Sequence, residues 1–407
     1  MIRTALVTLC LVLLFSECQS QSRPRYVLLV SFDGFRFDYV DKFNAPNFKK
    51  FIKAGVAAEG LIPSYPSKTF PNHYTLVTGL VPGHHGIVDN SFYDPSLHRK
   101  FGMSDTLAVM DASFYGGVPL WNLVQEQGLK SASLFWVGSE APIGGKWPDY
   151  YLAYDESMPD RARVDQVMEW FRLPADARPR FVSLYFEVVD TEGHTYGTES
   201  KETAAAVKHA DTILGYITDE LTKLPFEVNV VIVSDHGMLE LALKQETYLI
   251  VDEILGTGNK DLQVISTGTQ VHIYGENLDS LFQHLKEREL HFKVLRKPEF
   301  PVQWHYHSDR VGDVLLVADK GYYFRMKPFD AAKLPPGSPN VFGVHGYDAD
   351  VVPEMKGIFY AMGPHIAKGK IISAFRNIHV YPFLARLLGV DPPETDGDPR
   401  VLKKVLR

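Results

Sequence analysis

Cysteine is nearly absent from this 407-residue chain, which contains only Cys10 and Cys18. Both lie close to the N-terminus, so a disulfide bond cannot hold the rest of the chain together. A large exported chain without disulfides is more typical of a bacterial periplasmic or secreted protein than of an animal extracellular one. We therefore expect the fold to depend on its hydrophobic core and on bound metal ions.

The N-terminal segment has the order of a secretory leader. Arg3 precedes an apolar run from Ala5 to Phe15, and small and polar residues follow up to Ser20. Because the run is shorter than the roughly 20 residues that a membrane-spanning helix needs, a retained anchor is the less favoured alternative. We predict that residues 1–20 form a signal peptide, that residues 21–407 form one domain, and that the protein is exported to the periplasm or secreted.

An excess of positive charge is also missing. The chain has 42 basic and 49 acidic residues and a formal net charge of −7. A chain without a global positive field lacks the electrostatic signature of a non-specific nucleic-acid-binding surface. A small anionic ligand would therefore have to be attracted locally, and a bound metal ion is the usual means. The sequence gives no indication of an oligomeric state.

Short apolar runs alternate with helix-like segments along the chain. The runs at 26–31, 181–189 and 228–234 each precede an acidic or glycine-containing loop. Such runs are typical of parallel strands buried on both faces, and their alternation with helices favours an α/β fold with a doubly wound, mostly parallel sheet. Segments 261–274 and 311–324 instead suggest antiparallel strands of a small subsidiary sheet. The predicted helices, on both faces of the main sheet, are 45–54, 118–127, 161–171, 203–221 and 278–289.

Metal-ligand residue types follow the three predicted parallel strands. Asp33 follows the first strand, Asp190 and His194 follow the second, and Asp235 and His236 follow the third. An Asp at such a position more often caps a helix or forms a turn, so no cluster is informative alone. In sheets of this class, however, functional groups gather at the carboxyl ends of the strands. We therefore expect these side chains to converge.

Two further segments add to this set. In the run Pro-Ser-Lys-Thr-Phe-Pro-Asn-His at 66–73, a helix that begins after Pro71 would leave Thr69 beside free backbone N–H groups. Such groups favour an anion or a developing oxyanion. Ser67 is the competing hydroxyl. His345 lies between two glycines, which indicates close approach of the backbone to another group.

Together these segments supply three Asp and three His, with Glu192 as a candidate additional ligand. That is about the number of ligands that two divalent metal ions need. Mixed imidazole and carboxylate ligation without thiolate indicates zinc or manganese. With the Thr69 hydroxyl added, the set is typical of a two-metal site for phosphoryl transfer.

The order of these motifs resembles that of the nucleotide pyrophosphatase/phosphodiesterases in the alkaline phosphatase superfamily. The agreement runs from about residue 26 to about residue 390, and its specific parts are the Lys-Thr-Phe-Pro-Asn-His run at 68–73 and the Ser-Asp-His-Gly run at 234–237. The cysteine-rich modules and the nuclease-like domain of the animal members have no counterpart here. The chain therefore resembles a single-domain bacterial member, with residues 21–407 as the catalytic domain. The matching positions are Asp33, 66–73, Asn90, Asp190, His194, Asp235, His236 and His345.

The resemblance implies two zinc ions per chain and a role for each matched residue. Thr69 would be the nucleophile and would form a covalent threonine-linked intermediate. Asn90 would donate a hydrogen bond to a phosphate oxygen, and the backbone N–H of Phe70 would add a second. His73 would support this loop from behind. The implied ligands are Asp190, His194 and His345 for one zinc, and Asp33, Thr69, Asp235 and His236 for the other.

The resemblance also implies a nucleotide substrate and a nucleoside 5′-monophosphate product. Its base would stack between Phe70 and Tyr154, with Tyr151 as the alternative to Tyr154, and each stacking contact would contribute about 1–3 kcal/mol. The alternative is that these rings simply pack in the core. The matched loops contain no additional arginine for a monoester, so a diester is favoured. The loops at 94–113 and 300–309 are candidates for shaping the pocket.

Other functions compete with this one. A phosphodiesterase for choline or lipid headgroups, similar to a phospholipase C, would use the same two-metal site and an aromatic, acidic cage for the quaternary ammonium. A non-catalytic binding protein that keeps the fold is disfavoured, because all seven metal-ligand positions are filled. A sulfatase is excluded, because the cysteine or serine motif that is modified in those enzymes is missing.

Overall fold

The structure is a computed structural model that describes residues 24–256, 262–330 and 337–407. The predicted signal peptide lies outside the described residues, as does Asp261 at the start of one predicted antiparallel stretch. Within these ranges, no helix combines the length and the apolar character that crossing a bilayer requires.

The larger sheet has eight strands in the order β19-β2-β18-β9-β1-β8-β6-β7. Its centre consists of β9 (Asn229–Val233), β1 (Val27–Phe32) and β8 (Phe181–Phe186), which are parallel and correspond to the three predicted strands. Only β18 (Phe359–Met362) runs antiparallel to its neighbours among the described strands of this sheet. The remaining strands are β2 (Val56–Ala58), β6 (Ser131–Leu134), β7 (Tyr150–Leu152) and β19 (Lys370–Ile372).

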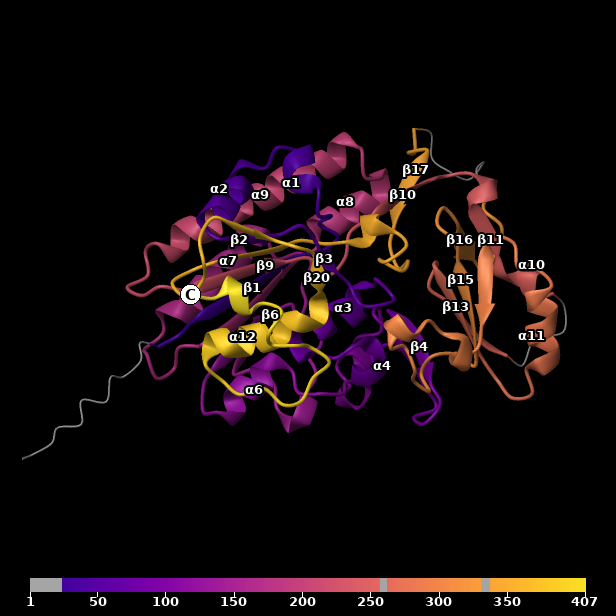
Figure 1. Ribbon diagram of the computed structural model, residues 1–407, viewed down its shortest axis with the longest axis horizontal. Coiled ribbons are helices and arrows are strands. Elements are labelled where there is room, and N and C mark those ends of the chain that lie inside the picture. The colour runs from indigo at the N-terminus through magenta and orange to yellow at the C-terminus, as the bar shows by residue number, and fades with distance from the viewer. Residues whose placement is uncertain (1–23, 257–261, 331–336) are drawn as a thin grey trace, which may run out of the picture.

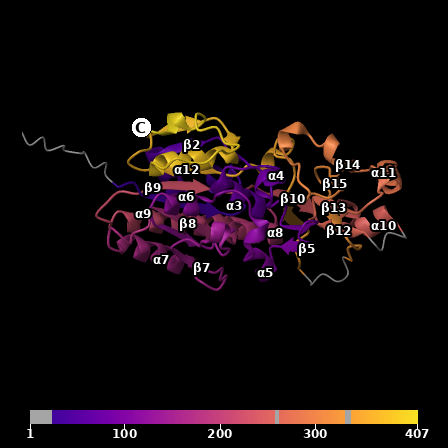
Figure 2. The same ribbon diagram turned by 90° about the horizontal axis from the view of Figure 1, so that it is seen from below.

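Helices cover both faces of this sheet, as the sequence predicts. Alternate side chains of β1 point to opposite faces, so Leu28 and Val30 enter one core and Val27 and Leu29 enter the other. Figure 2 shows α12 on one side of the sheet and α7 and α9 on the other. The first core contains α2 (Pro46–Ala54), α7 (Asp160–Arg172) and α9 (Lys201–Leu221), and the second contains α3 (Thr69–Thr78), α6 (Leu120–Glu126) and α12 (Val380–Leu388).

The predicted start of one helix and the predicted end of one strand differ from the structure. Helix α3 begins at Thr69 rather than after Pro71, because proline is tolerated in a first helical turn, where its missing N–H has no intrahelical partner. Strand β8 ends at Phe186 rather than at Val189, and α8 (Val188–Tyr196) begins at once. The apolar run was wrongly assigned to one strand because it continues into the first turn of a buried helix.

The smaller sheet lies beside the larger one (Figure 1) and is antiparallel throughout its described strands, which confirms the predicted subsidiary sheet. Its order is β12 (Gln263–Ser266), β13 (Gln270–Tyr274), β15 (Val314–Ala318) and β14 (Phe292–Leu295). A separate apolar core beneath it includes side chains of α10 (Val251–Leu255) and α11 (Asp279–Lys286).

Short elements connect the two sheets or cap their edges. Strand β10 (Leu239–Ala242) pairs with β17 (Val341–Val344), and β11 (Tyr248–Ile250) pairs with β16 (Tyr323–Arg325). The remaining short elements are β3 (Leu61–Ile62), β4 (Ser91–Asp94), β5 (Arg99–Gly102), β20 (Phe375–Arg376), α1 (Tyr39–Lys42), α4 (Pro82–His85) and α5 (Thr106–Val109).

Candidate active site

Three carboxylates meet at the carboxyl edge of the central strands. Asp33 follows β1, Asp235 follows β9, and Asp190 lies in the first turn of α8. One oxygen of each, namely Oδ1 of Asp33, Oδ1 of Asp190 and Oδ2 of Asp235, is buried and has no hydrogen-bond partner among the described residues. Burial raises the pKa of Asp33, and the charges of Asp235 and Asp190 raise it further. Such a concentration of buried negative charge is suited to a bound cation.

Three imidazoles direct their Nε2 atoms towards these carboxylates. His194, His236 and His345 each have Nδ1 at 2.7–2.9 Å from a backbone carbonyl oxygen, so Nδ1–H donates and Nε2 keeps its lone pair. The Nε2 atoms of His194 and His345 lie 3.1 Å apart, a contact that a shared cation would stabilise. His194 Nε2 is also 3.4 Å from Asp190 Oδ2. The three acceptors are the carbonyl oxygens of Gly343, Gly237 and Ser67, respectively.

Five of the predicted ligands form two overlapping groups, and His194 belongs to neither, although its Nε2 lies against that of His345. The ligand atoms of Asp33, Asp235 and His236 lie within 4.8 Å of one another, and so do those of Asp190, His236 and His345. The structure therefore places His236 within reach of both groups, whereas the sequence assigned it to one. Imidazole nitrogens and carboxylate oxygens without thiolates fit divalent metal ions such as zinc.

The hydroxyl of Thr69 borders this cluster. Thr69 is the first residue of α3, is buried, and has its Oγ1 at 3.2 Å from Nε2 of His236. The competing hydroxyl of Ser67 is engaged elsewhere, because it donates to the carbonyl oxygen of Tyr347 at 2.7 Å and accepts the N–H of Gly346 at 3.0 Å. Of the two hydroxyls, the structure brings only that of Thr69 to the predicted ligands.

His73 lies behind the cluster. Its Nδ1 donates to the carbonyl oxygen of Thr69 at 3.0 Å, and its Nε2 accepts from the hydroxyl of Ser31 at 2.8 Å. Burial alone would raise the pKa of Asp235, but His236 and His73 hold that pKa well below its usual range. His73 therefore both fixes the first turn of α3 and helps to keep Asp235 ionised.

Sequence reasoning missed two supports of the carboxylates. The hydroxyl of Tyr185 donates to Oδ2 of Asp33 at 2.7 Å, which directs Oδ1 towards the cluster. Gly34 has a φ of +65° and its backbone N–H lies 3.3 Å from Oδ1 of Asp235, while a Cβ there would lie 2.9 Å from Asp190. Only glycine fits this turn. The one available signal for Tyr185 was its polar group near the end of a mostly apolar strand.

Asn90 faces the nucleophile loop from the turn before β4. Its Oδ1 accepts the backbone N–H of Phe70 at 2.9 Å. The N–H of Phe70, expected to bind a phosphate oxygen, is thus engaged by Asn90 in this structure. Since the carbonyl end of the Asn90 amide is held, its NH₂ group is the end left to donate.

An aromatic cavity of about 230 Å³ opens beside Thr69. Its walls include Phe70 and Tyr154, and the predicted loop at 94–113 contributes Met103, Thr106 and Val109. The alternative Tyr151 does not line this cavity and instead stacks on Trp147, with ring centroids 6.4 Å apart. The structure therefore brings Phe70 and Tyr154, but not Tyr151, to one cavity next to the cluster.

The other candidate loop, at 300–309, lines neither this cavity nor the larger one whose lining includes His194 and His345. Its Trp304 stacks on Tyr65 with ring centroids 3.7 Å apart, and Tyr306 is fully buried. This loop supports the fold rather than lining either cavity.

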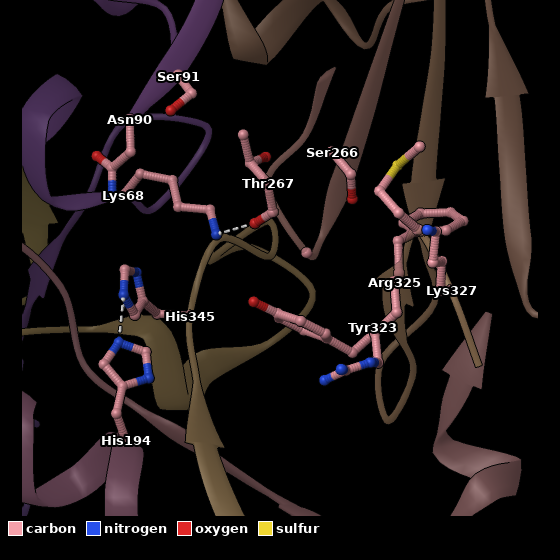
Figure 3. Close-up of a pocket in the computed structure, with 13 residues that line it drawn as sticks. Lys68, Asn90, Ser91, His194, Ser266, Thr267, Tyr323, Arg325, Lys327 and His345 are labelled. Atoms are coloured by element: carbon pink, nitrogen blue, oxygen red, sulfur yellow. Dashed lines mark hydrogen bonds between the residues drawn. The ribbon is translucent and has the colours of Figure 1, made fainter. Parts of the chain in front are cut away.

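A second cavity of about 570 Å³ has His194 and His345 in its lining (Figure 3). Three basic side chains line it, from Lys68, Arg325 and Lys327. Burial lowers the pKa of Lys68, although nearby carboxylates oppose that change. The sequence did not point to Arg325 or Lys327, because residues 323–327 carry none of the recognisable motifs.

Comparisons with known proteins find similar chains. The profile of the family described as type I phosphodiesterase / nucleotide pyrophosphatase matches residues 27–348. The chain is 33% identical to ectonucleotide pyrophosphatase/phosphodiesterase family member 1 of Mus musculus, over 96% of this chain and 44% of the relative. It is also 33% identical to the venom phosphodiesterase CdcPDE of Crotalus durissus collilineatus, over 96% of this chain and 48% of that protein. The chain thus spans about half the length of these curated relatives.

Solved structures show the same fold. An inactive form of murine ectonucleotide pyrophosphatase / phosphodiesterase 5, in complex with AMP, superposes with a TM-score of 0.86 at 32% identity. The match covers 94% of this chain and all of that one. The human counterpart superposes equally well, with a TM-score of 0.86 at 31% identity.

Proposed function

The chain belongs to the type I phosphodiesterase / nucleotide pyrophosphatase family, and from that premise we propose that it hydrolyses phosphodiester and pyrophosphate bonds of nucleotides. The product would be a nucleoside 5′-monophosphate. One observation carries this proposal: the Thr69 hydroxyl touches the metal-ligand cluster and lines the aromatic cavity. The AMP bound to the murine relative supports a nucleotide at such a site.

Two zinc ions would complete the site. The unpaired carboxylate oxygens and the Nε2 lone pairs supply the donor atoms, and the described cluster contains no thiolate. When bound, zinc would lower the pKa of a coordinated hydroxyl or water and stabilise negative charge on the phosphoryl group. The proposed ligands are Asp190, His194 and His345 for one ion, and Asp33, Thr69, Asp235 and His236 for the other.

The residues of the chain would divide the reaction into two steps. Thr69 Oγ1 would attack phosphorus while the bond from phosphorus to the leaving-group oxygen breaks and the hydroxyl proton passes to the leaving group, which leaves the nucleotide esterified to Thr69. Water then hydrolyses this ester, releases the 5′-monophosphate and restores the hydroxyl. The Asn90 NH₂ group would donate to a non-bridging oxygen, and a donor in such a position typically contributes about 10²–10³ to kcat.

The two cavities suggest how a nucleotide lies in the site. The base would enter the aromatic cavity between Phe70 and Tyr154, where stacking tolerates different bases. The leaving group would lie in the basic cavity, where Arg325 and Lys327 would attract negative charge. This arrangement favours a leaving group that carries phosphate.

A choline or lipid-headgroup diester is the second candidate substrate. The aromatic cavity also contains Glu140, whose Oε1 accepts the backbone N–H of Tyr154 at 3.1 Å. A carboxylate among aromatic rings is the environment that binds a quaternary ammonium group. The same metal centre would serve either substrate, so the choice depends on the cavities beside it.

We also propose that the protein is exported, to the periplasm or the medium. The leader-like order of the first 20 residues supports this, and relatives are named as ectoenzymes or venom enzymes. Mass spectrometry of the protein recovered from its producing cells should find an N-terminus near Gln21. A chain that still begins at Met1 outside the cytoplasm would contradict the leader.

The function can be tested with two chromogenic substrates. Zinc-loaded protein should hydrolyse p-nitrophenyl thymidine 5′-monophosphate faster than p-nitrophenyl phosphocholine, and Thr69→Ala should abolish both reactions. Thr78→Ala, at the other end of α3, is the matched control, because its hydroxyl bonds the carbonyl oxygen of Tyr74 at 2.7 Å and should leave activity intact. Dominant phosphocholine turnover would move the substrate to the second candidate, and an active Thr69→Ala would refute the nucleophile.

A further inference from the structure

A buried acid–imidazole pair lies next to the site but outside the chemistry described so far. Asp89 and His272 are both fully buried, and they are 183 residues apart in the sequence. Nδ1 of His272 lies 3.5 Å from the N–H of Gly312 and can accept it, which leaves Nε2–H to donate to Oδ2 of Asp89 at 3.1 Å. Asp89 directly precedes Asn90, and His272 belongs to β13 of the smaller sheet.

Within the described ranges, the donors to this carboxylate are Asn90 of the site and two residues from the smaller sheet and its turn, Thr267 and His272. Its Oδ1 accepts the backbone N–H of Asn90 at 2.7 Å. Its Oδ2 accepts the hydroxyl of Thr267 at 2.9 Å in addition to the bond from His272. A buried carboxylate with three donors is held firmly, and loss of one donor leaves charge that is only partly compensated.

Asn90 is therefore fixed from both ends. Asp89 holds its backbone, and the N–H of Phe70 holds the carbonyl of its side chain. The same turn of the smaller sheet also reaches the nucleophile loop, because the carbonyl oxygen of Thr267 accepts Nζ of Lys68 at 2.7 Å (Figure 3). The segment Thr267–His272 thus contacts the residue before Thr69 and the residue before Asn90.

We propose that Asp89, His272 and Thr267 act as positioning residues that aim the NH₂ group of Asn90 at the phosphate oxygen. This inference rests on the proposed function, in which Asn90 stabilises the transferring phosphoryl group. The alternative is a purely structural link between the two sheets. If these residues position Asn90, a variant should lower kcat and leave substrate binding intact, because displacing a donor by about 1 Å can lower the rate about 10²-fold. If they only link the two sheets, a variant should lower the stability of the fold instead.

The expected effects follow from which donor is removed. His272→Leu should lower kcat about 10- to 100-fold with little change in KM, because the lost interaction strengthens in the transition state. His272→Gln can still donate an N–H to Asp89 and should recover most of that loss. Thr267→Val removes one hydroxyl, keeps the carbonyl that Lys68 uses, and should cost less than His272→Leu.

A double-mutant cycle with Asn90→Ala separates positioning from structure. If His272 acts through Asn90, His272→Leu should reduce kcat in the wild-type background and have almost no further effect in the Asn90→Ala background. Equal fold losses in both backgrounds, or no loss in either, would overturn the proposal. Should His272→Leu fail to fold, Thr267→Val carries the same cycle.

The control is Val294→Ala, which removes a fully buried side chain from β14 of the same sheet without touching Asp89. It should lower the melting temperature and leave kcat unchanged, which shows that destabilising the sheet is not enough. The outcomes also distinguish the two proposals. Wild-type turnover of the nucleotide ester tests the function, and an Asn90→Ala variant with full kcat would remove the role of Asn90 and this inference together.

Discussion

The two sheets contribute to one site in different ways. The central strands of the larger sheet lead directly into Asp33, Asp190 and Asp235, so its edge carries groups that can bind metal. The described strands of the smaller sheet contribute no member of either metal-ligand group, but its turn at Thr267 contacts the loops of Thr69 and Asn90. The candidate metal-ligating side chains are concentrated where parallel strands end, whereas the smaller sheet contacts the loops that carry Thr69 and Asn90.

The two cavities repeat this contrast. The aromatic cavity is lined by residues of the larger sheet and its edge, such as Phe135 and Tyr185. The lining of the basic cavity includes Ser266 of the smaller sheet and Tyr323 and Arg325 of β16. Variants at the sheet edge should therefore abolish turnover. Variants in the cavities should change which substrate is preferred.

The largest effect is expected for the nucleophile. Thr69→Ala removes the hydroxyl beside His236 and should lower kcat by about 10³-fold or more, as loss of a nucleophile does in comparable enzymes. Initial rates with p-nitrophenyl thymidine 5′-monophosphate provide the measurement. Ser67→Ala should retain much more activity, and the reverse order of the two variants would contradict the assignment.

Metal removal should be nearly as damaging. Dialysis against a strong chelator should abolish turnover, and added zinc should restore it, because the proposed ions would be held by the carboxylates of Asp33, Asp190 and Asp235 and by the imidazoles of His236 and His345. Metal analysis of the active protein should give about two zinc ions per chain. Full activity in a metal-free preparation would contradict a metal-dependent site.

A smaller and substrate-specific effect is expected in the aromatic cavity. Tyr154→Ala should raise KM for the nucleotide ester by about 5- to 150-fold, the equivalent of one lost stacking contact of about 1–3 kcal/mol. Tyr151→Ala is the matched control, since its ring lies outside the cavity and should leave KM unchanged. Equal effects of the two variants would remove the distinction between these tyrosines.

The smallest effect is expected in the basic cavity. Arg325→Ala should raise KM for a dinucleoside pyrophosphate by about 3- to 10-fold at low salt, because an exposed charge interacts weakly and is screened. The nucleotide p-nitrophenyl ester, whose leaving group carries no phosphate, should be unaffected. Lys208→Ala, an exposed cation on α9, should change neither substrate. If both substrates respond alike to Arg325→Ala, the cavity does not bind the leaving group.

The fold and the cluster of candidate ligands were predictable because the aspartates lie just after apolar runs that are typical of buried strands. Asp33 and Asp235 come directly after buried apolar strands, and the ends of neighbouring parallel strands meet at one edge. The limits of α8 were not predictable in the same way. Hydrophobicity continues from Phe186 into Val188 and Val189 without a break, and it does not distinguish a strand from the first turn of a buried helix.

Contacts between distant segments left no pattern in the sequence. His272 reads as an ordinary apolar-strand residue, and only the packing of the smaller sheet brings it to Asp89. Arg325 and Lys327 likewise show no motif in the sequence, and only the fold brings them to the cavity that Lys68 also lines. For Phe70 the sequence predicted a contact that the structure does not leave open. Its backbone N–H was expected to bind a phosphate oxygen, but it already donates to Oδ1 of Asn90.

The most direct test of the central claim is to trap the nucleotide on Thr69. Wild-type protein turning over p-nitrophenyl thymidine 5′-monophosphate is quenched rapidly in acid and digested, and the peptides are analysed by mass spectrometry. We expect the mass of a thymidylyl group on the peptide that carries Thr69, and no such adduct in Thr69→Ala. An adduct on another residue such as Ser67, or active turnover with Thr69 replaced, would contradict the account.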